Sequence, residues 1–294
     1  MEAVQDIKRR IRSVQNTRKI TKAFELVAAA RLRRAQARIE AMRPYADRMM
    51  ELMVGTARAS TSVRGLPLLQ RREIRTAAVL GLTGDRGLAG AFNAQILRQV
   101  FAVERRLRSE GVEARWLVSG RKGASTLRFR RYDVAKAWIG FSDRPAYSDA
   151  QAIAHTITEL YAEGEVDSVI VVYNHFESPL VQRVVEQEIL PIPETLLEGG
   201  EEHAAALVGD FIYEPEPEEI LERLLPVYVE TELFRALLES AASEQGARMT
   251  AMRNASKNAA ELTDTLTLRM NRARQAEITQ EILEVVAGAD ALTG

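Results

Sequence analysis

The chain has 294 residues with 40 Lys and Arg against 41 Asp and Glu, an ordinary composition for a protein with a substantial core. No stretch approaches the roughly 18 uninterrupted apolar residues of a membrane span. The first 30 residues also lack the apolar run of a secretory signal, so we expect a cytosolic origin. Because there is no cysteine and the three histidines are isolated, the sequence excludes disulfides and thiolate metal sites, and we expect no metal and no cofactor.

Charge is distributed unevenly along the chain. Residues 1–43 contain 12 Lys or Arg and four acids, whereas residues 190–235 contain 12 acids and only Arg223 and Arg235 to oppose them. This asymmetry predicts that the two regions face different partners. The basic arm lacks the aromatic residues typical of nucleic-acid binding, so an acidic protein surface is the better expectation.

Residues 3–43 contain neither glycine nor proline and predict a long helix. Its apolar residues recur at alternating spacings of three and four, the pattern of a coiled-coil seam. They begin with Val4, Ile7, Ile11 and Val14. The pattern resumes over 32–49, and between the two stretches it shifts to Ile20, Phe24 and Val27, which predicts a change of partner.

A second long helix is predicted from about Val227 to Val286, because Pro226 is the last proline and few glycines follow it. Its predicted seam is rich in small residues, which favours close approach of a second helix, although helix propensity alone also explains many alanines. The predicted seam residues are Leu238, Ala241, Ala255, Ala259, Leu262, Leu266, Ala273 and Ala276. We expect the two terminal helices to form an antiparallel coiled coil in which the end of the longer C-terminal helix has no partner.

The middle of the chain has a different pattern. Short apolar runs at 77–82, 114–118 and 168–173 predict strands, and helical patterns at 93–109 and 147–163 separate them. Residues 180–189 predict an added strand. The fold class is therefore α/β, a long antiparallel coiled coil of the N- and C-terminal helices plus a central Rossmann-like α/β domain. We predict a coiled-coil helix at 1–60, the α/β domain with an acidic connecting loop at its end at 75–210, and a coiled-coil helix at 220–290.

Glycines after the first predicted strand, between Gly84 and Gly90, lie where a phosphate-binding loop occurs in nucleotide-binding proteins. The spacing matches neither the dinucleotide nor the P-loop motif, so we favour a structural turn in which Asp85 and Arg86 bond locally. Residues 120–126 resemble a phosphate cradle in composition only. A nucleotide-binding α/β domain with helical arms remains the alternative function.

Four segments closely resemble the gamma subunits of F-type ATP synthases. They are IKRRIRSVQNTRKITKAFELVAAARLRRAQ (7–36), TGDRGLAGAFN (83–93), YEPEPEEILERLLPVYVE (213–230) and the run from Ser243 to Leu292. The resemblance extends over nearly the whole chain and is weaker over 110–210. Many family members have serine and cysteine where this chain has Gly84 and Ala89.

The resemblance implies a non-catalytic central-stalk rotor that couples proton flow through the membrane ring to ATP synthesis or hydrolysis by rotation. The implied partners are the alpha, beta, epsilon and c subunits, and the implied association with the membrane is only through the complex. The absence of a transit segment and of a cysteine-bearing insert implies the bacterial type. The expected location is the cytoplasmic face of the plasma (inner) membrane, as a peripheral protein.

The resemblance also implies three sets of contact residues. Contact with a beta subunit falls on Arg274, Gln275, Thr279, Gln280, Glu281, Lys19, Lys22 and Phe24. An apolar bearing tip falls on Ile282, Leu283, Val285 and Val286. Contacts with the epsilon subunit and the c ring fall on Phe211, Tyr213 and Glu214, which we call the foot residues.

Overall fold

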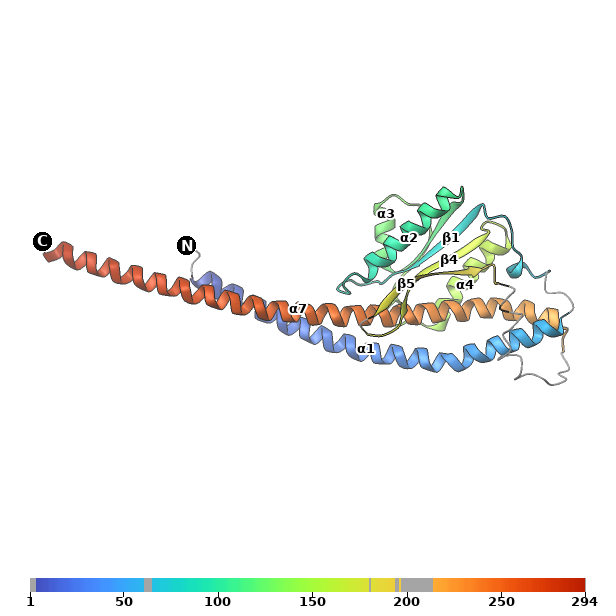
Figure 1. Cartoon of the computed structure of the whole chain (residues 1–294), viewed down its shortest axis with the longest axis horizontal. Helices are drawn as coiled ribbons and strands as arrows, with labels where there is room; N and C mark the ends of the chain where they lie inside the picture. The colour runs from blue at the N-terminus through green and yellow to red at the C-terminus, as the bar shows by residue number, and fades with distance from the viewer. Residues whose placement is uncertain (1–3, 61–64, 180, 194–195, 197–213, 294) are drawn as a thin grey trace. The chain divides into compact units, whose positions relative to one another are not determined.

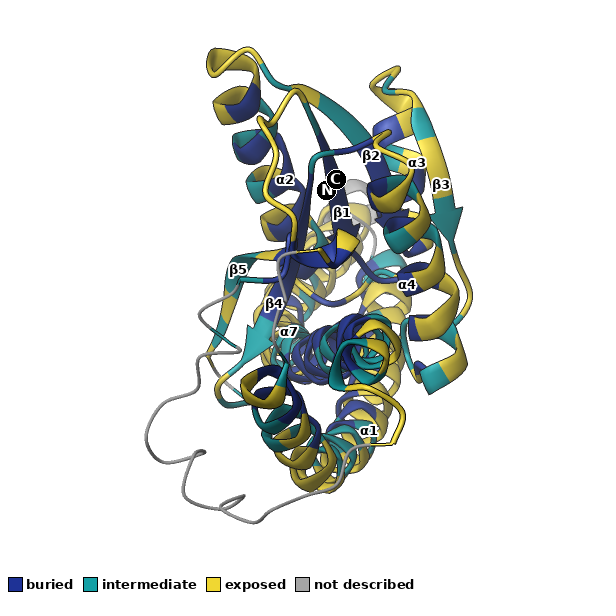
Figure 2. Cartoon of the chain, turned by 90° about the vertical axis from the view of Figure 1, so that its right-hand side faces the viewer, coloured by how far each residue is buried: buried dark blue, intermediate teal, exposed yellow. Residues whose placement is uncertain are grey.

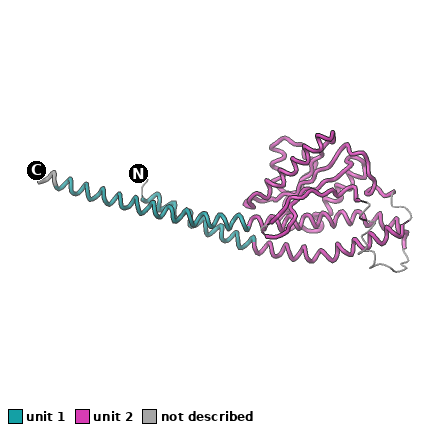
Figure 3. Tube along the Cα trace, in the orientation of Figure 1, with its two compact units in different colours: residues 1–28, 249–294 teal, residues 29–248 magenta. Residues whose placement is uncertain are grey.

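The computed structural model describes residues 4–60, 65–179, 181–193, 196 and 214–293. Two long helices, α1 (Val4–Ala59) and α7 (Pro217–Thr293), are the first and last elements, and all the other elements lie between them in the sequence (Figure 1). Within the described residues, no helix has the length and hydropathy needed to cross a membrane. The chain forms two compact units, Met1–Ala28 with Met249–Gly294, and Ala29–Arg248 (Figure 3). Each long helix therefore contributes to both units, and the three-part division along the sequence stays a prediction.

In the first unit, α1 and α7 pair in opposite directions. Ile7 and Ile11 of α1 cluster with Leu266 of α7, while Glu25 of α1 bonds to Arg253 of α7. Contacts thus move toward the start of α7 as α1 advances, which is an antiparallel arrangement. The seam follows from the three-four spacing, which keeps one stripe of each helix against its partner.

The seam of α1 does not shift at residues 18–28, and here the sequence-based expectation was wrong. Thr21, Glu25 and Ala28 continue the spacing that starts at Ile7 and are buried. The apolar residues beside them, Ile20 at 55% and Phe24 at 45%, are exposed. Helix geometry decides this: a straight pair keeps its register, so polar residues occupy the seam when they find partners there.

The seam of α7 lies one position away from part of the predicted stripe. Met252, Ser256, Ala259 and Leu266 are buried, whereas Leu262 is 48% exposed. The buried set keeps a spacing of three and four from Met249 onward, and this spacing passes through position 263 instead of 262. Ranking residues by apolar character alone therefore misplaced the seam.

The second unit contains a five-stranded sheet in the order β3-β2-β1-β4-β5. Its strands are β1 (Thr76–Leu82), β2 (Glu113–Ser119), β3 (Val134–Trp138), β4 (Ser168–Phe176) and β5 (Gln182–Leu190). The first four are parallel, and β5 pairs antiparallel with β4. Its helices are α2 (Phe92–Ser109), α3 (Arg121–Phe129), α4 (Tyr147–Ala162) and a short 3-10 turn, η1 (Pro67–Leu69). The predicted fold class is confirmed.

Helices cover both faces of this sheet, and the strands β1 and β4 are buried over most of their length (Figure 2). On one face Val79 and Val172 pack under α2 and α3. On the other face Leu80 and Val171 pack against α4 and the second-unit parts of α1 and α7. Alternation along each strand sends successive side chains to opposite cores, which is why these strands read as continuous apolar runs.

Two elements and one helix boundary differ from the prediction. The sequence analysis did not identify α3 or β3, because both are short and β3 (VAKAW) is only half buried at the sheet edge. Helix α7 begins at Pro217 and runs through Pro226 instead of starting after it. Leu221 and Leu225 on this added stretch, and Val229 just after it, are buried in the core. Their packing outweighs the roughly 3 kcal/mol that an internal proline costs a helix.

Candidate functional site

The end of α7 presents polar and apolar side chains that are exposed on the described part of the first unit. The cluster around Ile7 ends at Ala273. Beyond it, the five predicted polar contact residues and the four tip residues are all exposed, with Val285 at 72%. Among the described residues, the side chains of these polar residues form hydrogen bonds only within the helix, from Thr279 to the carbonyl of Gln275 and from Gln280 to Glu284. An exposed apolar group of this kind marks an interaction surface.

A basic hollow of about 940 Å³ lies between the two helices of the first unit. Its cationic lining consists of Arg18, Lys19, Lys22, Arg253 and Lys257. The only acid in the lining is Glu25, which accepts hydrogen bonds from Lys22 (2.9 Å) and Arg253 (3.1 Å). The hydrogen bond from Lys22 lowers the pKa of Glu25, and Arg253 acts in the same direction. Burial of the carboxyl group opposes this shift but does not cancel it. The remaining cations favour an acidic partner surface.

The predicted foot residues are only partly described. Glu214 is exposed, just before α7 begins. Phe211 and Tyr213 lie outside the described residues.

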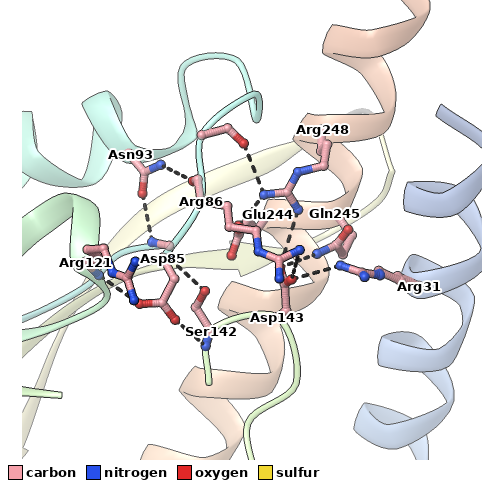
Figure 4. A network of polar contacts seen from close by, with 12 residues as sticks. Arg31, Asp85, Arg86, Asn93, Arg121, Ser142, Asp143, Glu244, Gln245 and Arg248 are labelled. Atoms are coloured by element: carbon pink, nitrogen blue, oxygen red, sulfur yellow. Dashed lines mark hydrogen bonds and ion pairs between the residues drawn. The ribbon is translucent and has the colours of Figure 1, made fainter. Parts of the chain in front are cut away.

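The loop between β1 and α2 ties together the carboxyl edge of the sheet (Figure 4). The Asp85 carboxylate accepts backbone N–H bonds from Arg121 (3.0 Å), Gly140 (2.8 Å) and Ser142 (3.1 Å). These donors belong to the start of α3 and to the loop between β3 and α4, so Asp85 does not bond locally as expected. The turn therefore has a structural role, because its Asp85 holds together the loops that follow β1, β2 and β3.

The N-terminal amides of α3, the kind of group that binds phosphate in other folds, already have protein acceptors. Lys122 N–H donates to the Gly84 carbonyl (3.1 Å), and Gly123 N–H donates to the Thr83 hydroxyl (2.9 Å). Gly120 makes this packing possible, since a Cβ there would lie 2.0 Å from the Thr83 carbonyl oxygen. The cradle-like composition of 120–126 therefore reflects close loop packing.

Helix α7 places a carboxylate against the glycine loop. Glu244, 1% exposed, lies so close to Gly84 that a Cβ at position 84 would be 2.8 Å from Glu244 Oε1. Arg248 donates to Glu244 (2.5 Å) and to the Gly87 carbonyl (3.3 Å). Burial raises the pKa of Glu244, and the Arg248 guanidinium opposes that effect.

A third carboxylate, Asp143, is the acceptor at the centre of the same network (Figure 4). It forms ion pairs with Arg31 (2.8 Å), Arg86 (3.4 Å) and Arg248 (3.6 Å). The sequence analysis did not find Asp143, Glu244 or Arg248. The spacing of Glu244 and Arg248 marks a helical pair, but nothing local to position 143 signals its partners, which are distant in sequence.

Comparison with known proteins identifies the family. A family model described as ATP synthase matches residues 3–292. The chain is 49% identical to the ATP synthase gamma chain of Rubrobacter xylanophilus, covering 99% of both chains. It is 47% identical to that of Moorella thermoacetica, covering 99% of this chain and 100% of the other. The chain belongs to the ATP synthase gamma chain family.

Solved structures agree with this membership. A chain from the central stalk and c-ring structure of the Tetrahymena thermophila mitochondrial ATP synthase matches at 28% identity with a TM-score of 0.58, covering 81% of this chain and 99% of that one. A chain of the Euglena gracilis enzyme shares the fold at 17% identity, with a TM-score of 0.69 and coverage of 98% and 94%. This member of the family is a stalk subunit that acts as rotor in a membrane-bound ATP synthase, and it is not the catalytic subunit.

Proposed function

We propose that rotation of this chain couples proton flow through a membrane ring of c subunits to ATP synthesis or hydrolysis in a ring of alpha and beta subunits. The helices within 1–60 and 220–290 act as the shaft, and the α/β domain within 75–210 takes up rotation beside the epsilon and c subunits. The chain works as a peripheral component at the cytoplasmic face of a bacterial plasma membrane. The exposed end of α7 is the observation that carries this proposal.

The tip of α7 acts as a bearing. Ile282, Leu283, Val285 and Val286 are apolar and exposed on the isolated chain. Burial of such side chains against a ring of apolar residues is favourable, at about 25 cal/mol per Å² of apolar surface. Because apolar contacts have no directional hydrogen bonds, the tip turns within such a sleeve without losing a specific bond at each step.

Polar residues one to three turns before the tip provide the contacts that depend on angle. Arg274 and Gln275 are exposed, and within the described residues their side-chain donors make no ion pair or hydrogen bond, so they are available to a partner. Hydrogen bonds to a beta subunit are directional and form at one angle of rotation at a time. Thr279, Gln280 and Glu281 extend the same contact.

The basic hollow supplies a second contact with a beta subunit. Lys19 and Lys22 line it, and the exposed Phe24 lies on the same helix. Acidic side chains of the beta subunit form ion pairs with these cations, while apolar side chains of the same subunit cover Ile20 and Phe24. This accounts for an apolar stripe that the seam does not use.

The foot contact involves Glu214 together with Phe211 and Tyr213. Glu214 is exposed where the chain enters α7, and an acidic group there suits polar or basic loops of epsilon and the c ring.

Reconstitution tests the proposal. Purified alpha and beta subunits are combined with and without this chain, and complex formation and ATP hydrolysis are measured. We expect a stable complex with multi-site hydrolysis only when the chain is present. The double variant Arg274→Ala/Gln275→Ala should weaken assembly or turnover, because it removes donors that the isolated chain does not use internally.

A matched control removes the same two residue types elsewhere. Arg98→Ala/Gln95→Ala alters exposed residues of α2 and should behave as the unmodified chain does. Equal effects of the two double variants would reject the assigned contact. If alpha and beta subunits do not bind the chain and the isolated chain binds ATP, the alternative nucleotide-binding function replaces the rotor assignment.

A further inference from the structure

The junction between α7 and the sheet in the second unit changes character along the helix. From Leu221 to Leu237 its apolar residues belong to the core on that face of the sheet, and Gln187 of β5 bonds to Glu232 and Arg235 at the border of this core. Beyond Leu237, buried polar residues meet the sheet. Ser240 donates to the Leu82 carbonyl (3.3 Å), and Ser243 donates to the Asn174 carbonyl (3.1 Å). At the carboxyl edge the helix is thus held by directed bonds in addition to the packing of small apolar residues such as Ala241 and Ala242.

Asp143 connects four segments at this edge. It lies between β3 and α4, and its carboxylate contacts α1 through Arg31 and the glycine loop through Arg86. It contacts α7 through the Gln245 amide (3.1 Å) and the Arg248 guanidinium. One side chain therefore links the α/β domain to both long helices (Figure 4).

No other carboxylate in the described part of the chain replaces Asp143. Arg31 and Arg86 each have Asp143 as their only ion-pair partner among the described residues. Arg248 has Glu244 as well, yet its buried Nη1 atom has no hydrogen-bond partner within the same part of the chain. The Asp143 side chain is 24% exposed, so solvent only partly screens these attractions.

We propose that Asp143 is a positioning residue that locks α1 and α7 to the α/β domain against rotational slip. This inference rests on the proposed function, in which the α/β domain takes up rotation and the helices deliver it. Torque about the helix axes acts as shear at the junction. Apolar surfaces slide with little loss of contact, whereas an ion pair with fixed distance and direction opposes the first displacement.

The test compares ATP hydrolysis with ATP-driven proton pumping in vesicles that contain the complete complex. Asp143→Ala removes the shared carboxylate, and Arg31→Gln removes only the link to α1 from a half-exposed site. We expect both variants to hydrolyse ATP, while the number of protons pumped per ATP falls to less than about half of the wild-type value. The reason is that the ion pairs holding the long helices to the α/β domain are lost. Asp143→Glu retains the carboxylate and should restore most of the ratio.

The matched control is Asp133→Asn, which removes one negative charge from an exposed residue whose side chain forms no hydrogen bond or ion pair among the described residues. It should leave the ratio unchanged. A purely structural role predicts that pumping and hydrolysis fall in proportion in both variants, and that result would overturn the lock. A normal ratio in Arg31→Gln would also overturn it if Asp143→Ala fails to assemble. If the wild-type chain supports no coupled pumping, the proposed function itself fails.

Discussion

Gly120 provides the sharpest test of how the carboxyl edge is packed. It has φ of +96°, a conformation that side chains with a Cβ rarely adopt. A Cβ at this position would also lie 2.0 Å from the Thr83 carbonyl oxygen and 2.5 Å from its carbon. Gly120→Ala therefore combines a backbone penalty with displacement of a neighbouring strand end.

The expected size follows from these two parts. Holding a non-glycine residue in such a region costs about 1–3 kcal/mol. Relieving an overpacked contact by moving the neighbouring backbone typically costs about 1–3 kcal/mol more. The free energy of unfolding of the α/β domain should therefore fall by about 2–6 kcal/mol, a large share of the roughly 5–15 kcal/mol that stabilises a typical domain.

The assay is urea unfolding of the full chain followed by tryptophan fluorescence. Both tryptophans of the sequence, Trp116 and Trp138, lie on β2 and β3, so the signal reports on the α/β domain. Gly140→Ala is the control, because Gly140 has φ of +103° but nothing within 4 Å of a built Cβ. It should show the backbone penalty alone. Equal losses for the two variants would show that the contact with Thr83 does not limit this position.

Three further outcomes are expected. Since the pKa of Glu25 is lowered by Lys22 and its other partners, its carboxylate stabilises the folded chain above about pH 4.5. The difference in melting temperature between the wild type and Glu25→Gln should therefore vanish as the pH falls below that value, and a constant difference would contradict the pairing. Leu266→Ala should destabilise the helix pair by about 2–5 kcal/mol in circular dichroism melts, because it empties a buried seam position. Ile20→Ser/Phe24→Ser should change the stability of the isolated chain by less than about 0.5 kcal/mol, yet weaken assembly with alpha and beta subunits; a large loss of stability would place these residues in the seam.

The sequence alone determined the two long helices, the helices α2 and α4, and four of the five strands. The absence of breakers over 3–43 and the three-four spacing from Ile7 to Val14 specify a long helix with one buried stripe, and local geometry is sufficient for that inference. Apolar runs of strand length specified β1, β2 and β4 for the same reason. The family followed from residue identity in the terminal helices.

Only the tertiary structure decided which polar groups are buried and what they contact. Thr21 and Glu25 occupy the seam because their side chains find partners there, including Arg253, more than 200 positions away. Pro226 remains inside a helix because the residues around it are packed in the core. Asp143 acquires its role from groups on α1, α7 and the glycine loop, which folding brings to one point. Such contacts depend on distances across the fold, and local propensity and periodicity do not encode them.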